Sequence, residues 1–203
     1  MSHVVYLHGL GQTHRSFNYL LTFLPEHNHK LIDYDSQQPL EDSIEQVRKH
    51  LPKGELILVG HSLGGVISVI LAADNEQIKR LVTISSPIAG SKMANALRWL
   101  PGSMPIISDI VPRGKYIIRA GNLMLSIPTL SIISTGGHLP ASVEPNDGVV
   151  SIESQRGLQF GKKVEVNTNH FEILQHEKTV KHLTDFIFAE KGLHEAPQNE
   201  SVS

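Results

Sequence analysis

The sequence predicts an α/β protein, with a mostly parallel β-sheet flanked by helices on both faces. Apolar runs that do not alternate with polar residues end at His8-Gly9 and at Gly60, and such runs are typical of strands buried on both faces. Strand patterns cover 4–7, 30–34, 56–59, 81–84, 129–134 and 164–166. Helical spacing of apolar residues lies at 17–24, 44–51, 66–73 and 171–189. Because strands and helices alternate, we expect right-handed crossovers and parallel strands.

Local chemistry supports these elements in chain order. The first strand is Val-Val-Tyr-Leu, and the first helix has apolar residues three and four apart before Pro25. The 30–34 strand pattern is weaker, and the helix after it ends before Pro52. Leu-Ile-Leu-Val at 56–59 then precedes an apolar helical run at 66–73. The last helix has one apolar face, made of Val180, Leu183, Phe186 and Ile187.

Composition fits one folded domain. The 203 residues lie within the size of a single core, and 40% hydrophobic with 19% charged residues argues against intrinsic disorder. A formal net charge of −2 does not favour nucleic acid as a partner. We therefore expect one domain over 1–193, followed by a disordered polar tail at 194–203.

Several classes of site and location are not indicated. The longest strongly apolar stretch, at 66–73, is far shorter than the roughly 20 residues that span a bilayer, and no secretory signal is visible. We therefore expect a cytoplasmic protein without an integral membrane segment. The absence of Cys excludes thiolate ligands, and no metal, P-loop or complete dinucleotide motif occurs, so we expect neither metal nor cofactor.

Two segments break the alternation of strands and helices. Residues 91–126 contain three prolines and scattered apolar residues, which predicts an insertion of short helices and loops that could act as a cap or lid. Its apolar residues either line an acyl-binding site or form the core of the cap. Residues 139–158 are polar and rich in turn formers, which favours a long functional loop.

Gly60-His61-Ser62-Leu63-Gly64 fits the G-x-S-x-G nucleophile elbow. The string alone is common, but here it lies between a buried strand and an apolar helical run, which is the setting that the elbow requires. Glycines are needed there because the turn is tight and strained. The alternative is a serine that merely caps the helix. The side chain of His61 is expected to point away from the nucleophile and pack.

These motifs resemble the α/β-hydrolase superfamily and, within it, small bacterial lipases and esterases. The likeness covers most of 4–189: H-G-L-G after the first strand, then V-G-H-S-L-G-G, N-D-G-V-V-S and N-H-F, in the order Ser, Asp, His. It implies Ser62 as nucleophile, and backbone amides of Leu10 and Leu63 as the oxyanion hole.

His170 is the predicted base, because it follows the last strand, where the superfamily places this residue; His138 is the rival. Asp147 is the predicted acid, in the segment E-P-N-D-G-V-V-S. The same letters also suit a simple turn, and Glu144, Glu153 and Asp109 remain alternatives.

The expected function is a serine hydrolase that cleaves carboxylic esters, with a hydrophobic acyl ester as its substrate. A thioesterase or an amidase would use the same three side chains, because they fix acyl transfer and not the leaving group. A non-catalytic binding protein with the same fold is the alternative from another class.

Overall fold

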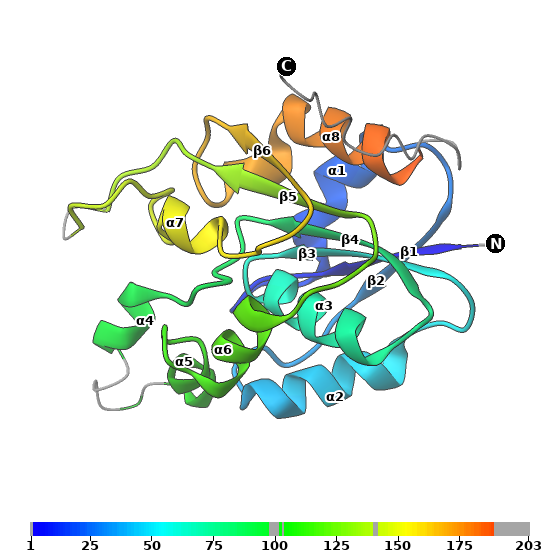
Figure 1. Cartoon of the computed structure of the whole chain (residues 1–203). Helices are drawn as coiled ribbons and strands as arrows, with labels where there is room; N and C mark the ends of the chain where they lie inside the picture. The colour runs from blue at the N-terminus through cyan, green and yellow to red at the C-terminus, as the bar shows by residue number, and fades with distance from the viewer. Residues whose placement is uncertain (1, 98–101, 103, 140–141, 189–203) are drawn as a thin grey trace, which may run out of the picture.

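The computed structural model describes residues 2–97, 102, 104–139 and 142–188, in which a parallel β-sheet lies between two layers of helices (Figure 1). The strands are β1 (His3–Leu7), β2 (Asn28–Ile32), β3 (Leu56–His61), β4 (Ile78–Ile84), β5 (Thr129–Ser134) and β6 (Lys162–Val166). Their order in the six-stranded sheet is β2-β1-β3-β4-β5-β6, and every neighbouring pair is parallel. The predicted fold class is confirmed, and so are all six strands.

Strand β4 begins three residues before the predicted start, at Ile78. Lys79 and Arg80 interrupt the apolar pattern there, so the sequence did not extend the strand to Ile78. Arg80 is at the edge of the core, where its guanidinium donates to the carbonyl oxygens of Phe186 and Ile187 at 2.5 and 3.1 Å. These are carbonyls of the last helical turn, which favours a cation.

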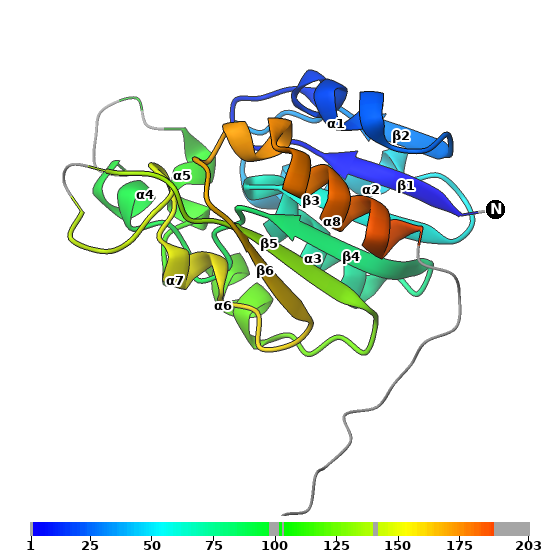
Figure 2. The same cartoon turned by 90° about the horizontal axis from the view of Figure 1, so that it is seen from above.

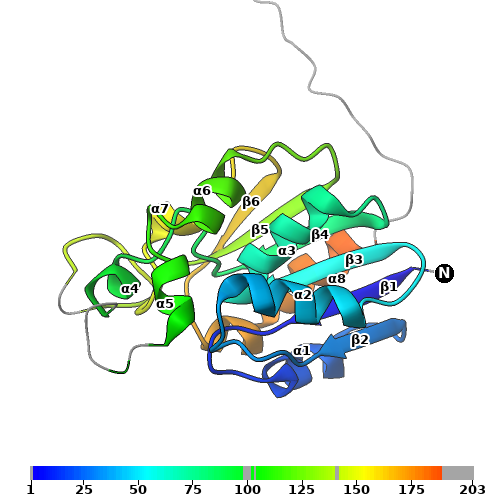
Figure 3. The ribbon, with the colours of Figure 1, turned by 90° about the horizontal axis from the view of Figure 1, so that it is seen from below.

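Helices cover both faces of the sheet. One face carries α1 (Asn18–Phe23) and α8 (Glu177–Ile187), which Figure 2 shows from above, and the short 3₁₀ segments η1 (His14–Phe17) and η2 (Glu172–Gln175) adjoin them. The other face carries α2 (Leu40–His50), α3 (Leu63–Asp74) and α6 (Lys115–Asn122), seen from below in Figure 3. Each layer buries its own hydrophobic cluster against the sheet.

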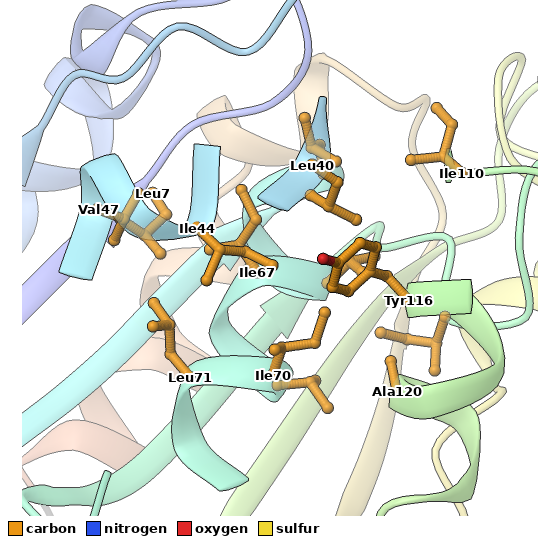
Figure 4. Packing of buried hydrophobic residues seen from close by; sticks show 14 of the residues in the cluster. Leu7, Leu40, Ile44, Val47, Ile67, Ile70, Leu71, Ile110, Tyr116 and Ala120 are labelled. Carbon is orange, nitrogen blue, oxygen red and sulfur yellow. The ribbon is translucent and has the colours of Figure 1, made fainter. Parts of the chain in front are cut away.

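Helix α3 is the centre of the larger cluster. Figure 4 shows Ile67 of α3 beside Ile44 of α2, and Ile70 of α3 beside Tyr116 and Ala120 of α6. All five side chains are buried, and each large aliphatic one contributes about 1.5–3 kcal/mol on leaving water. This packing fixes the start of α3, and with it the turn that carries Ser62.

The predicted helix over 171–189 is wrong in one respect, since it consists of two pieces. The 3₁₀ segment η2 ends before His176, whose extended backbone separates it from α8. His176 is the N-cap of α8, and its Nδ1 accepts a hydrogen bond from the amide of Lys178 at 3.1 Å. The spacing of the apolar residues continues across His176, so the sequence pattern does not reveal that the helix is interrupted there. The predicted tail at 194–203 lies outside the described residues.

The segment at 91–126 contains α4 (Lys92–Leu97), α5 (Pro105–Asp109) and α6. Helix α6 packs against α3 and belongs to the layer below the sheet, whereas α4 and α5 lie beyond the carboxyl ends of the strands (Figure 1). The predicted loop at 139–158 includes the short helix α7 (Ile152–Gln155). The sequence did not predict this helix, because turn-forming residues lie on both sides of it. Within the described ranges, no helix combines the length and apolar character that a membrane span requires.

Candidate active site

The candidate site lies where the strand order reverses, at the carboxyl ends of β1 and β3. The chain passes from β1 outward to β2 and then returns to the other side of β1 as β3. Parallel sheets bind ligands at such a point, because the loops that follow the two strands diverge and leave a crevice. Here the loop after β1 carries Gly9 and Leu10, and the turn after β3 carries Ser62.

Ser62 lies in the tight turn between β3 and α3, with φ of 52° and ψ of −120°. This backbone conformation is strained for a residue with a side chain and costs of the order of 1–3 kcal/mol. A Cβ atom on Gly60 would lie 2.3 Å from the Gly64 oxygen, and one on Gly64 would lie 2.1 Å from the Leu7 oxygen. The turn therefore fits against β1 only with glycine at both positions.

The structure brings the three predicted side chains together. His170 Nε2 lies 3.1 Å from Ser62 Oγ, and His170 Nδ1 lies 2.7 Å from Asp147 Oδ2. Because the carboxylate is an acceptor, Nδ1 donates its hydrogen to Asp147, and Nε2 is left as the acceptor for the Ser62 hydroxyl. His170 is 3% exposed and Asp147 is 0% exposed, so the contact between these two side chains is shielded from water, whereas Ser62 is partly exposed.

A turn sets the position of Asp147. Gly148 has φ of 95°, and the chain reverses so that the amides of Val149 and Val150 donate to Asp147 Oδ1 at 3.0 and 2.7 Å. The backbone carbonyl of Asp147 accepts from the amide of His170 at 3.0 Å. The segment Asn146-Asp147-Gly148 is therefore a turn, and the same turn places the acidic side chain beside His170.

Two further buried side chains hold the other carboxylate oxygen. Ser134 Oγ donates to Asp147 Oδ2 at 2.5 Å, and Gln155 Nε2 donates to it at 3.0 Å. Burial alone raises the pKa of a carboxyl, but His170, through its hydrogen bond and charge, and the Ser134 hydroxyl lower the pKa of Asp147 below its usual value. Asp147 is therefore ionised at neutral pH.

Ser134 and Gln155 were not among the predicted site residues. Ser134 ends β5, so its place at the carboxyl edge of the sheet was a usable signal. Gln155 lies in α7, which the sequence did not indicate, and nothing in its neighbourhood distinguishes it from a surface glutamine.

The alternative residues lie elsewhere. His138 is exposed in the loop after β5 and has no described contact with Ser62. Asp109 accepts from the amide of Leu40 at 2.8 Å. The other two alternatives also lie apart from Ser62: Glu144 forms an ion pair with Lys92, and Glu153 is exposed on α7.

The side chain of His61 is buried, as predicted, but it does not turn away from the site. Its ring centroid lies 5.0 Å from that of His170, and its Nε2 donates to the His170 carbonyl at 2.9 Å. Its Nδ1 lies 3.0 Å from Gln12 Oε1, and that oxygen accepts a hydrogen bond from the Gly9 amide at 3.1 Å. His61 thus connects the loop after β1 to the turn that carries His170.

A cavity of about 210 Å³ lies above Ser62, and Leu10, Leu63 and His170 are among the residues that line it. Its remaining wall is largely apolar and comes from the 87–110 segment and the turn after Asp147: Pro87, Met93, Ala94, Met104, Ile107, Ile110, Val149 and Val150. Trp99 and Leu100, two further apolar residues of the 91–126 segment, lie outside the described residues. A larger cleft of about 840 Å³ borders α6 and α7 and contains neither Ser62 nor His170.

Two backbone amides beside Ser62 are available to a bound oxygen. Leu63 is the first residue of α3, where an amide has no acceptor within the helix. In the loop after β1, the described hydrogen bonds engage the amides of Gly9, Gly11 and Gln12, and none engages that of Leu10. No group of three or more potential metal-ligating side chains occurs in the part of the chain that the structure describes.

A family model described as the alpha/beta hydrolase fold matches residues 27–106. Among solved structures, the Bacillus licheniformis lipase BlEst2 in its propeptide form has a TM-score of 0.73 at 16% identity, covering 95% of this chain and 51% of that one. A lipase-esterase related protein from Clostridium acetobutylicum has a TM-score of 0.67 at 14% identity, with 91% and 94% covered.

A metagenomic carboxyl esterase has a TM-score of 0.66 at 15% identity, with 84% of this chain and 65% of that chain covered. This chain therefore spans about half the length of the Bacillus lipase and 65% of the length of the metagenomic esterase. A comparison with curated proteins finds no match. The fold is that of the α/β-hydrolases.

His61 makes the stability of the fold sensitive to acid. Burial, together with the neighbouring His170, lowers the pKa of His61 from 6.5 to about 3, so the native ring stays neutral where the unfolded chain binds a proton. The free energy of unfolding therefore falls as the pH drops below 6.5. Between pH 7 and pH 5 this residue accounts for a loss of about 2 kcal/mol.

Urea unfolding at pH 7 and pH 5 measures this loss. In His61→Gln the difference between the two pH values is expected to shrink by about 2 kcal/mol. The exposed His138 provides the matched control, since His138→Gln is expected to keep the wild-type difference. An unchanged difference in His61→Gln would contradict the prediction.

Proposed function

We propose that this chain, which has the fold of the α/β-hydrolases, is a serine hydrolase that cleaves carboxylic esters with hydrophobic acyl groups. The observation that carries the proposal is the continuous chain of contacts from Ser62 Oγ through His170 to Asp147. Lipase and esterase neighbours share the fold, which favours acyl transfer over other uses of this scaffold.

The proposed reaction follows from the direction of the hydrogen bonds. Ser62 Oγ attacks the ester carbonyl carbon while His170 Nε2 takes the hydroxyl proton. His170 then delivers that proton to the leaving alcohol as the tetrahedral intermediate collapses to an acyl-enzyme. Water, deprotonated by His170, then attacks the acyl-enzyme, and His170 returns that proton to Ser62 Oγ as the second tetrahedral intermediate collapses and releases the acid. Asp147 stays ionised throughout and stabilises the imidazolium.

The amides of Leu10 and Leu63 are proposed to hold the oxyanion. Both residues border the cavity beside Ser62, and an anion at the start of α3 also gains from the positive end of the helix. Because backbone amides donate, the apolar side chains at these positions remain available to contact the acyl group.

The cavity wall favours an apolar acyl group of limited length. The wall consists largely of aliphatic and methionine side chains, and these come from the 87–110 segment, α5 and the turn after Asp147. A volume of about 210 Å³ is small beside the roughly 300–1,000 Å³ of pockets that hold drug-sized ligands, which favours short and medium acyl chains. We therefore propose acyl chains of about six to eight carbons as the best substrates. The segment containing α4 and α5 is then the cap over the acyl site.

Ser62→Ala is expected to lower ester hydrolysis by roughly 10⁴ to 10⁶ in kcat, because the nucleophile is removed, and to abolish labelling by a fluorophosphonate. Peptide mass mapping of the labelled wild-type protein is expected to locate the phosphonate on Ser62. Ser68→Ala is the matched control, because Ser68 is a buried serine on the same helix whose hydroxyl donates to the Gly64 carbonyl. Retained hydrolysis in purified Ser62→Ala would exclude the assignment.

Asp147→Asn is expected to lower kcat by about 10⁴, because an amide nitrogen facing His170 favours the wrong tautomer. The described donors bind both oxygens of the Asp147 carboxylate, but the asparagine side chain has only one oxygen that can accept a hydrogen bond. Steady-state rates on a short-chain ester, with circular dichroism to verify folding, measure this loss. A near-normal rate in a folded variant would contradict the assignment of Asp147 as the acid.

A series of p-nitrophenyl esters tests the acyl site. From two carbons upward, kcat/KM is expected to rise about fourfold per methylene, in line with about 0.8 kcal/mol for each buried methylene, and to fall beyond about eight carbons. Met104→Ala is expected to move the optimum to longer chains. A wild-type preference for sixteen carbons would contradict the proposed length. Thioesters and amides with the best acyl group, assayed in parallel, identify the leaving group.

A further inference from the structure

Next to Asp147, two buried serines form a chain of hydroxyl groups that ends at the carboxylate. Ser134 Oγ lies 2.5 Å from Asp147 Oδ2, and Ser85 Oγ lies 2.6 Å from Ser134 Oγ. Ser85 is 1% exposed and Ser134 is 0% exposed, and neither lines the cavity above Ser62. The proposed reaction assigns no part to Ser85 or Ser134.

The hydrogens in this chain have one consistent direction. An ionised carboxylate only accepts, so Ser134 donates its single hydroxyl hydrogen to Asp147. Ser134 Oγ can then only accept from Ser85, which makes Ser85 the donor of the 2.6 Å bond. Both O–H dipoles therefore point toward the carboxylate, and each strengthens the next.

Ser85 occupies a backbone position that suits glycine better. It follows β4 with φ of 50°, in the left-handed region that is strained for a residue other than glycine. Its amide donates to the Ile132 carbonyl at 2.9 Å, a bond that glycine would make equally well. What serine adds at this position is the hydroxyl group, and its described partner is Ser134.

We propose that Ser134 and Ser85 are positioning residues that fix the Asp147 carboxylate and moderate its charge at Oδ2, the oxygen that faces His170. This inference rests on the proposed function of the site. Ser134 and Gln155 donate hydrogen bonds to the same oxygen as His170 Nδ1. Part of the negative charge of this oxygen therefore interacts with these two donors, and less of it stabilises the imidazolium form of His170. The titratable side chains in described contact with the His170 side chain are Asp147 and His61, and burial keeps His61 neutral.

The neighbouring strand residues offer a matched control. Thr83 Oγ1 donates to Ser131 Oγ at 3.1 Å, and this buried hydroxyl pair joins the same two strands, β4 and β5. It has no described contact with Asp147. Ser131→Ala therefore removes a buried hydroxyl of the same kind without touching the carboxylate.

The first test measures labelling of Ser62 by a fluorophosphonate across pH 5 to 9 in the wild type and three variants. Ser134→Ala is expected to label about tenfold more slowly at neutral pH, because the carboxylate is less firmly held. The acid limb of the pH profile, which is the fall in labelling rate on the acidic side, is expected to move to higher pH by about half a unit. Without the Ser134 hydroxyl, the full charge of the carboxylate faces His170 and makes protonation of that base easier.

Ser85→Gly is expected to shift the limb in the same direction by less, without loss of stability, because glycine relieves the backbone strain. Ser131→Ala is expected to keep the wild-type limb. Equal effects of Ser134→Ala and Ser131→Ala on rate and limb would overturn the proposal.

A second measurement separates this proposal from the proposed function. The proton between His170 Nδ1 and Asp147 Oδ2 is expected to give a far-downfield proton NMR signal in the free protein, and this measurement needs no substrate and no reaction. The proposal requires that this signal move further downfield in Ser134→Ala and stay in place in Ser131→Ala. A signal that stays in place in both variants overturns the positioning role, whether or not Ser62 is labelled. Failure to label wild-type Ser62, with the NMR shift present, counts against the proposed hydrolase alone.

Discussion

The burial of one ionised carboxylate is the constraint on which the geometry of the site depends. Asp147 has no exposed surface, and an unpaired charge in such a place costs many kcal/mol. Five donors offset that cost: the amides of Val149 and Val150, and the side chains of Ser134, Gln155 and His170. These donors come from β5, α7 and two turns, so the carboxylate receives all its hydrogen bonds only when these segments pack together. The same packing orients His170 toward Ser62.

Backbone strain is concentrated on the same edge of the sheet. Ser62 and Ser85 follow the adjacent strands β3 and β4, and they are the two non-glycine residues with positive φ in the described ranges. Each costs of the order of 1–3 kcal/mol. Their hydroxyls lie at the two ends of one polar chain, which runs from Ser85 through Ser134, Asp147 and His170 to Ser62. The packing of α3 and the sheet is what holds both residues in these conformations.

Sequence patterns predicted the parts of the molecule that depend on local chemistry. Sequence patterns predicted all six strands, although β2 lies at Asn28–Ile32 and not at 30–34. The elbow, the N-D-G turn and the order of Ser62, Asp147 and His170 identified the side chains that meet. The patterns missed what depends on tertiary contact. Gln155 is recognisable only once α7 lies against β5, and the helix break at His176 depends on a side-chain cap that leaves no trace in apolar spacing.

His61 shows why a neighbour of the nucleophile is hard to interpret from spacing alone. Its predicted orientation assumed that adjacent side chains diverge, as in a regular strand, but the left-handed turn at Ser62 ends that alternation. The ring instead donates to the carbonyl of His170 and contacts Gln12, whose amide oxygen holds Gly9. Because the ring stays neutral over the pH range in which a histidine base acts, it couples the loop carrying Leu10 to the turn carrying His170 without adding a charge that would compete with Asp147.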